Sequence, residues 1–239
     1  MRVIGYLTSG YPTIEKSVET ARVYVEGGCD MLEISIPLEN NREKPFLNDV
    51  MKQAYRECPD YDVHMEAIGR IAQQNPGVDI TILIYNEVLL EIGVEKFAAF
   101  CLKNGIHDVN SANLTDEHAL KVLDEQGIYL AGLVNYSLEE RRVSESLRSK
   151  GFVYCQAFPR EGQKLDPRYD TIDKLIPHLR ELGIHQKIYC GGGISKPEHA
   201  RQVKDAGADG FFLGSSIIAM YDQPEELKAI IRSFCDAVK

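Results

Sequence analysis

Short runs rich in β-branched and aromatic residues alternate with longer amphipathic stretches along the whole chain. Helical periodicity is clearest over residues 17–28, 94–105 and 195–207, and each stretch ends at glycine, as helix C-termini often do. The last stretch begins with Ser195 as the predicted N-cap and Pro197 in the first turn. The expected strands cover residues 3–8, 31–36, 80–85, 108–113, 129–135, 152–158, 187–192 and 210–215.

This repeated alternation predicts a parallel sheet, because crossover helices join parallel strands. Eight strand–helix units in 239 residues match a closed (β/α)₈ barrel, whose typical length is about 250 residues. We therefore expect an α/β fold in which residues 1–239 form a single TIM-barrel domain. A doubly wound open sheet is the alternative, but GYLTSGYPT after the first strand matches the dinucleotide-binding pattern GxGxxG poorly.

Composition narrows the function classes. The net charge is −9 with no block of Lys and Arg, which argues against nucleic acid as a partner. No run approaches the roughly 18 apolar residues of a membrane span, and the N-terminus lacks a cleavable signal. The six cysteines form no CxxC pair and are interpreted as buried free thiols, which favours a cytoplasmic protein.

The histidines show no metal-binding spacing, so we expect no metal site. His64, for example, is interpreted as a helix-face or cap residue.

Two glycine-containing segments follow the last two expected strands. CGGGIS covers residues 190–195 and LGSSII covers residues 213–218. Glycine lets the backbone approach a ligand closely, and these two loops of a barrel often hold a phosphate on their amides. Gly193, Gly214 and Ser215 are the predicted donors, although tight strand-to-helix turns would also explain the glycines.

One carboxylate lies within an apolar strand. Glu33 is surrounded in sequence by Met31, Leu32, Ile34 and Ile36, near the end of the second expected strand. A carboxyl group in apolar surroundings resists ionisation, which suits a general acid. A structural hydrogen-bond partner for Glu33 is the alternative.

Five motifs occur in one order at barrel spacing, namely GYLTSGYP, LEISIP, ILIYN, YCGGGIS and GADGFFLGSSI. With these motifs the chain resembles the tryptophan synthase alpha chain family over nearly its whole length. The resemblance implies retro-aldol cleavage of indole-3-glycerol phosphate into indole and glyceraldehyde 3-phosphate. It further implies that the chain binds no cofactor itself and has as partner a beta-type pyridoxal-phosphate subunit, which receives the indole.

The same resemblance assigns roles to single residues. Glu33 matches the catalytic glutamate that protonates the indole carbon, and Tyr154 matches an active-site tyrosine. Positions that bind phosphate in the family correspond to Gly193, Gly214 and Ser215. Positions that line the ring pocket correspond to Tyr6, Leu83 and Tyr85.

The chain departs from the family pattern at three places. The loop after the second strand, PLENNREKP, is one residue shorter, so that either Glu43 or Lys44 stands where the family has a second carboxylate. Asn110 and Asn113 replace an apolar pocket residue and an aspartate, and we expect both to contact the substrate, although water would satisfy their side chains equally. Loop six, FPREGQKLDPR, lacks the usual closing sequence, although Gly162 is available to donate to phosphate.

Two functions are consistent with these features. One is a carbon–carbon lyase acting on indole-3-glycerol phosphate or a more polar phosphorylated analogue, with Glu33 as acid/base and Glu43 as the second carboxylate. The other is a phosphate-binding or regulatory homologue that lacks the paired catalytic carboxylates.

Overall fold

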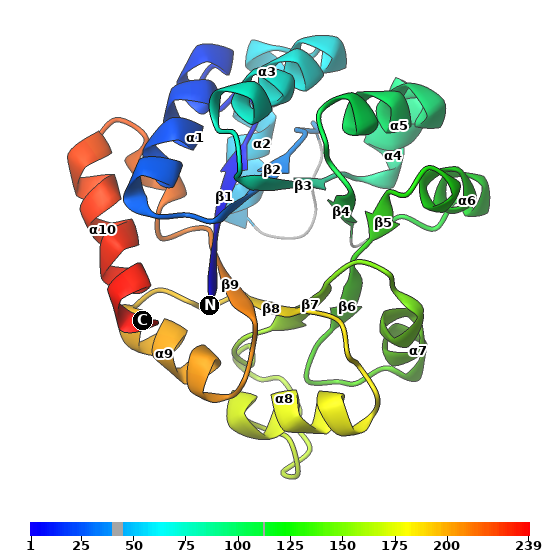
Figure 1. The fold of residues 1–239 in the computed structure, drawn as a ribbon, viewed down its shortest axis with the longest axis vertical. Coiled ribbons are helices and arrows are strands. Elements are labelled where there is room, and N and C mark those ends of the chain that lie inside the picture. Colours follow the sequence, from blue (N-terminus) through cyan, green and yellow to red (C-terminus); the bar gives the residue numbers. More distant parts are fainter. Residues whose placement is uncertain (40–44, 112) are drawn as a thin grey trace.

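The computed structural model describes residues 1–39, 45–111 and 113–239, in which strands line the centre and helices cover the outside (Figure 1). The strands are β1 (Arg2–Thr8), β2 (Met31–Ser35), β3 (Asp79–Leu83), β4 (Asp108–Asn110), β5 (Tyr129–Leu130), β6 (Gly132–Val134), β7 (Val153–Gln156), β8 (Ile188–Gly191) and β9 (Gly210–Leu213). The helices are α1 (Ile14–Gly27), α2 (Pro45–Glu57), α3 (Tyr61–Gln74), α4 (Asn86–Ile92), α5 (Val94–Lys103), α6 (Glu117–Glu125), α7 (Glu140–Arg148), α8 (Ile172–Glu181), α9 (Pro197–Asp205) and α10 (Pro224–Ala237), with a 3₁₀ turn η1 (Ile218–Met220).

The sheet closes into a barrel through an interrupted strand. Its order is β5-β4-β3-β2-β1-β9-β8-β7-β6, so that the two ends, β5 and β6, are consecutive pieces of chain separated by Ala131. The Ala131 amide donates to the Val109 carbonyl at 2.8 Å, and the Gly132 amide donates to the Phe152 carbonyl at 2.9 Å. Each side of the interruption therefore bonds one neighbouring strand, and the prediction of a (β/α)₈ barrel is confirmed. That residues 1–239 form one domain stays a prediction.

The barrel interior is filled with large side chains at its lower end, away from the carboxyl ends of the strands. Ile4, Met31, Phe152, Tyr189 and Phe212 form one buried cluster. The Phe152 ring lies 5.0 Å from Tyr189 and 6.1 Å from Phe212, centroid to centroid. The interior is therefore a packed core below, and polar side chains lie above it at the barrel mouth.

Several predicted strands extend too far at their C-terminal ends. The strand expected over 108–113 is β4, which ends at Asn110. The strand expected over 152–158 is β7, which ends at Gln156. The apolar run at 152–158 continues beyond β7 because the loop at the mouth also buries Ala157.

The predicted N-cap of α9 is wrong by one residue. The N-cap is Lys196, whose backbone is extended (φ −140°, ψ 151°), and Pro197 begins the helix. Proline restricts the preceding residue to extended conformations, which places the helix boundary directly before it. Ser195 instead donates its amide to the Nδ1 atom of His199 at 3.3 Å.

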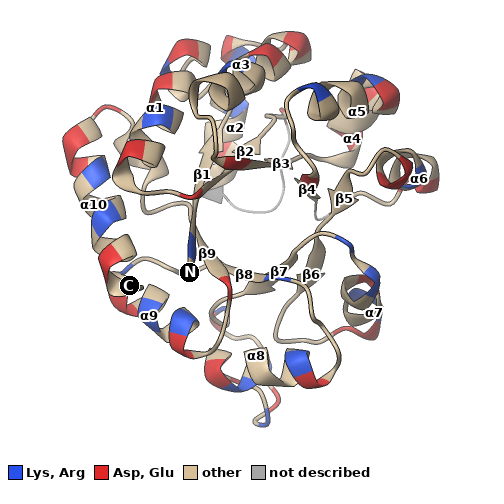
Figure 2. Cartoon of the chain, in the orientation of Figure 1, with Lys and Arg blue, Asp and Glu red and all other residues tan. Residues whose placement is uncertain are grey.

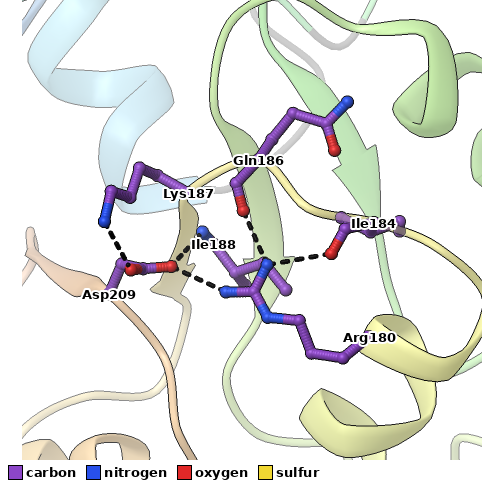
Figure 3. A network of polar contacts seen from close by, with 6 residues as sticks. All are labelled: Arg180, Ile184, Gln186, Lys187, Ile188 and Asp209. Atoms are coloured by element: carbon purple, nitrogen blue, oxygen red, sulfur yellow. Dashed lines mark hydrogen bonds and ion pairs between the residues drawn. The ribbon is translucent and has the colours of Figure 1, made fainter.

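A polar network fixes the start of β8 against the turn before β9 (Figure 3). Asp209 Oδ2 accepts hydrogen bonds from the Ile188 amide at 2.9 Å and from Arg180 Nη2 at 2.7 Å. Lys187 Nζ lies 3.0 Å from Asp209 Oδ1. Arg180 also donates to the carbonyls of Ile184 and Gln186 at 2.9 and 2.7 Å. This single carboxylate therefore holds α8, β8 and β9 in register at the amino ends of the strands.

Charges of both signs are interspersed over the outer helices (Figure 2). None of the helices in the described ranges is long and apolar enough to cross a membrane. All six cysteines are free; Cys29, Cys101, Cys155 and Cys190 are buried as predicted, whereas Cys58 and Cys235 are partly exposed. Within residues 1–39, 45–111 and 113–239, no cluster of three or more His, Cys, Asp or Glu side chains has metal-binding geometry.

Candidate active site

Glu33 lies inside the barrel on β2, and 5% of its surface is exposed. Its Oε1 atom accepts a hydrogen bond of 2.8 Å from the Nδ2 atom of Asn110, which is 6% exposed at the end of β4. The two residues are 77 positions apart in sequence and come from strands separated by β3. Asn110, predicted as a substrate contact, is therefore a direct partner of the predicted acid.

Tyr6 stands beside this pair on β1, within a cluster of hydroxyl groups. Its Oη atom lies 3.0 Å from both Thr8 Oγ1 and Ser35 Oγ, which are themselves 3.0 Å apart. Burial raises the pKa of Tyr6 to about 12, although its two hydrogen bonds oppose this, and the nearby charge of Glu33 adds to the rise. Tyr6 is thus a neutral phenol whose hydroxyl is bonded to Thr8 on its own strand and to Ser35 on β2, which leaves its ring to line the site.

Tyr154 approaches Glu33 from the opposite side of the barrel, on β7. Burial and then the charge of Glu33 raise its pKa well above the ordinary value. Its ring packs 5.2 Å from that of Phe212. A Cβ atom added at Gly191 would lie 2.4 Å from the Tyr154 hydroxyl, which means that glycine on β8 makes the space for this phenol. The site therefore brings Glu33, Asn110, Tyr6 and Tyr154 together at the mouth.

The two glycine loops follow β8 and β9, next to Tyr154. Gly193 has φ +87°, a left-handed conformation that favours glycine. A Cβ atom added at Gly214 would meet no described atom within 4 Å, so the space beside it is open. The amides of Gly193, Gly214 and Ser215 donate to no residue that the structure describes. Unpaired amides next to open space, as at Gly214, are an arrangement that suits an anion.

Loop six packs against the first glycine loop. The Phe158 ring lies 4.8 Å from the ring of His199, and an added Cβ at Gly193 would be 3.3 Å from Phe158. His199 Nδ1 lies 3.0 Å from the Gly193 carbonyl oxygen. Gly162, also in loop six, has φ +74° with open space around it. Gln156 Nε2 joins this loop to β7 through Gln163 at 3.0 Å.

The remaining predicted residues lie around the ends of β3 and β4. Leu83 is the register partner of both Ser35 and Asn110, which places it between them at the mouth. Tyr85 is buried and is the N-cap of α4. Asn113 bonds the chain itself: its Oδ1 accepts from the Asn86 amide at 3.0 Å, and its Nδ2 donates to Glu87 at 3.0 Å. The side-chain amide of Asn113 therefore bonds the first two residues of α4.

Glu43 and Lys44, between which the sequence left the second carboxylate open, lie outside the described residues. The sequence analysis also missed a buried histidine. His64 on α3 is fully buried; its Nδ1 lies 3.0 Å from Ser9 Oγ and its Nε2 lies 2.8 Å from the Cys58 carbonyl oxygen. Burial lowers its pKa. His64 does lie on a helix, as the sequence indicated, but its burial was not foreseen, because the β1–α1 loop places Ser9 and Gly10 against its ring.

Comparison with known proteins agrees with this geometry. The family model described as "Tryptophan synthase alpha chain" matches residues 1–236. The chain belongs to the tryptophan synthase alpha chain family. Its relatives in this family include the alpha chain of Thermosynechococcus vestitus, 26% identical over 99% of this chain and 90% of that protein. The alpha chain of Methanothermobacter thermautotrophicus is 27% identical over 90% of this chain and 81% of that protein.

Solved structures in the same family share the barrel. Tryptophan synthase from M. tuberculosis, in its aminoacrylate-bound form, aligns with a TM-score of 0.85 and 22% identity over 100% of this chain and 93% of that chain. The tryptophan synthase alpha chain from Legionella pneumophila aligns with a TM-score of 0.84 and 21% identity over 99% of this chain and 91% of that chain. At these identities the structures support the fold, and the membership of the family rests on the sequence match.

Proposed function

We propose that this protein is a carbon–carbon lyase that cleaves a phosphorylated substrate by a retro-aldol reaction, with Glu33 as the acid/base. The proposal rests above all on one observation: a buried carboxylate at the barrel mouth shares its site with two loops whose amides are open to an anion. Members of the family cleave indole-3-glycerol phosphate, which needs a proton donor at the ring carbon and a cradle for the phosphate.

In this reaction the bond between the ring carbon and the glycerol phosphate side chain breaks. Glu33 donates a proton to the ring carbon, while a base removes the proton of the side-chain hydroxyl as it becomes the aldehyde. The amides of Gly193, Gly214 and Ser215 hold the phosphate, with Gly162 from loop six as a further donor. Tyr154 is our candidate for a contact with the reacting ring. Glu43 remains our candidate for the second carboxylate.

We further propose that the ring is more polar than indole. The support is Asn110, which places an amide beside Glu33 where the family has an apolar residue. A buried polar group that a ligand leaves unpaired costs about 1–3 kcal/mol. Asn113 contributes less to this argument than its sequence position suggested, since its amide is bonded at the start of α4.

The test is steady-state cleavage of indole-3-glycerol phosphate by the purified protein, with and without a pyridoxal-phosphate beta-type subunit as partner. Glu33→Gln should reduce turnover about 10²- to 10⁴-fold, the usual worth of a positioned acid/base. Glu117→Gln, an isosteric change at an exposed position of α6, is the matched control. Near wild-type turnover in Glu33→Gln would remove Glu33 from the mechanism.

Two further results decide between the alternatives. A catalytic efficiency for indole-3-glycerol phosphate of about 10⁴ M⁻¹s⁻¹ or more, which is ordinary for an enzyme, would overturn the proposal that the substrate ring is more polar than indole. Binding of glycerol phosphate without cleavage of any ring-bearing substrate would favour the phosphate-binding or regulatory homologue.

A further inference from the structure

The hydrogen bond between Asn110 and Glu33 constrains where a proton can reside. A side-chain amide nitrogen carries two N–H donors and no acceptor. Asn110 Nδ2 lies 2.8 Å from Glu33 Oε1, so Oε1 must act as the acceptor in this contact. When Glu33 is protonated, its carbonyl oxygen is a better acceptor than its hydroxyl oxygen, so this contact favours Oε1 without the proton and Oε2 with it.

We propose that Asn110 is a positioning residue of the lyase, which holds Glu33 Oε1 as an acceptor and makes Oε2 the atom that carries and transfers the proton. The inference rests on the proposed function, because a transferred proton matters only if Glu33 is the acid/base. It concerns a residue where, by the resemblance drawn from the sequence, the family has an apolar pocket residue.

The bond is well placed to have this effect, because both partners are almost fully buried. Water competes little for either group, and a hydrogen bond in such surroundings fixes the orientation of both side chains. Asn110 is itself anchored, since its backbone carbonyl accepts from the Ile84 amide at 3.0 Å in the ladder with β3. The carboxylate is thus oriented from a rigid strand rather than from a loop.

Few described titratable groups share this part of the barrel. Tyr6 on β1 and Tyr154 on β7 both interact with the Glu33 charge and are neutral phenols near neutral pH. The charge of Arg160, in loop six, reaches Tyr154. Asp108 begins β4 and interacts with Asp79 and Arg2 at the other end of the barrel. These groups are unchanged in the Asn110 variants, so a difference in the titration of Glu33 from the wild type reports on the substitution of the amide.

The experiment compares two isosteric substitutions that each add one negative charge. Asn110→Asp replaces the donor by a carboxylate oxygen, which competes with Glu33 for a proton and should raise its titration midpoint by about one pH unit or more. Asn113→Asp is the matched control, because the amide of Asn113 bonds Asn86 and Glu87 instead. The midpoint is read from ¹³C-carboxyl signals of labelled Glu, and comparison with Glu33→Gln identifies the signal of Glu33.

Activity supplies a second readout. Asn110→Leu removes the donor without adding charge. With indole-3-glycerol phosphate as substrate it should lower kcat about tenfold or more, as expected for an interaction that matters in the transition state. In Asn110→Asp, the limb of the pH–rate profile that reports Glu33 should move in the same direction as the midpoint measured by NMR. Asn110→Ser, which keeps a short hydroxyl donor, should recover part of the lost kcat. Circular dichroism establishes that each variant is folded.

The outcomes separate the two proposals. Equal midpoints for Glu33 in the wild type and in folded Asn110→Asp would overturn the positioning role, whatever the activity. A raised midpoint with an unmoved pH–rate profile in an active enzyme would also overturn it. A raised midpoint in a protein that cleaves no substrate would support the Asn110–Glu33 linkage and reject the lyase.

Discussion

The carboxylate of Asp209 offers a quantitative test of how the amino ends of β8 and β9 are held together. In Asp209→Ala the Ile188 amide, which belongs to a fully buried residue, loses its side-chain acceptor, at a cost of about 1–3 kcal/mol. The ion pair with Arg180 is partly exposed, at 32% and 23%, and adds about 1 kcal/mol. Lys187 is 70% exposed and adds little. We therefore expect a loss of about 2–4 kcal/mol in the free energy of unfolding.

Urea unfolding followed by circular dichroism measures this loss, with an unchanged m-value as the sign that the folded state is otherwise intact. Lys187→Ala is the control and should cost less than about 0.5 kcal/mol. Burial pushes the Asp209 pKa up, but the Ile188 amide, Lys187 and Arg180 outweigh this and lower it. Its contribution is present above the unfolded pKa, about 3.9, and is lost as pH falls through the folded pKa. Equal losses in the two variants at pH 7 would refute the reasoning.

Three further predictions concern other sites. Burial lowers the pKa of His64, so the unfolded chain takes up a proton at this residue before the folded protein does as the pH falls. The free energy of unfolding should therefore decrease below about pH 6.5, by up to about 1.4 kcal/mol per pH unit. His64→Gln should flatten this slope in unfolding measured from about pH 7.5 to 5.5, and parallel slopes in the two proteins would contradict the prediction. Gly193→Val imposes a side chain at φ +87° beside Phe158 and should weaken inorganic phosphate binding about tenfold or more, in NMR titrations of a barrel that stays folded. Gly191→Ala would place a Cβ atom 2.4 Å from the Tyr154 hydroxyl; it should displace the phenol and lower turnover, and an unchanged kcat would show that Tyr154 is only a packing residue.

Much of the fold could be predicted from local pattern. The spacing of apolar runs, the glycines at helix ends and the order of the motifs are properties of neighbouring residues, and they were sufficient for the barrel and for its family. Glu33 stood out for the same reason, as one acid within an apolar run. Gly193 and Gly214 were apparent because the chain must turn where their strands end.

The partners of these residues were decided by the tertiary structure. The contact between Glu33 and Asn110 spans 77 positions, that between Ser9 and His64 spans 55, and that between Tyr6 and Ser35 spans 29. No periodicity relates such positions, because the register of neighbouring strands and the path of each loop bring them together. The sequence by itself determined which elements form and which residues are candidates for the site; the closed barrel decided which of these residues meet, as Asn110 and Glu33 do.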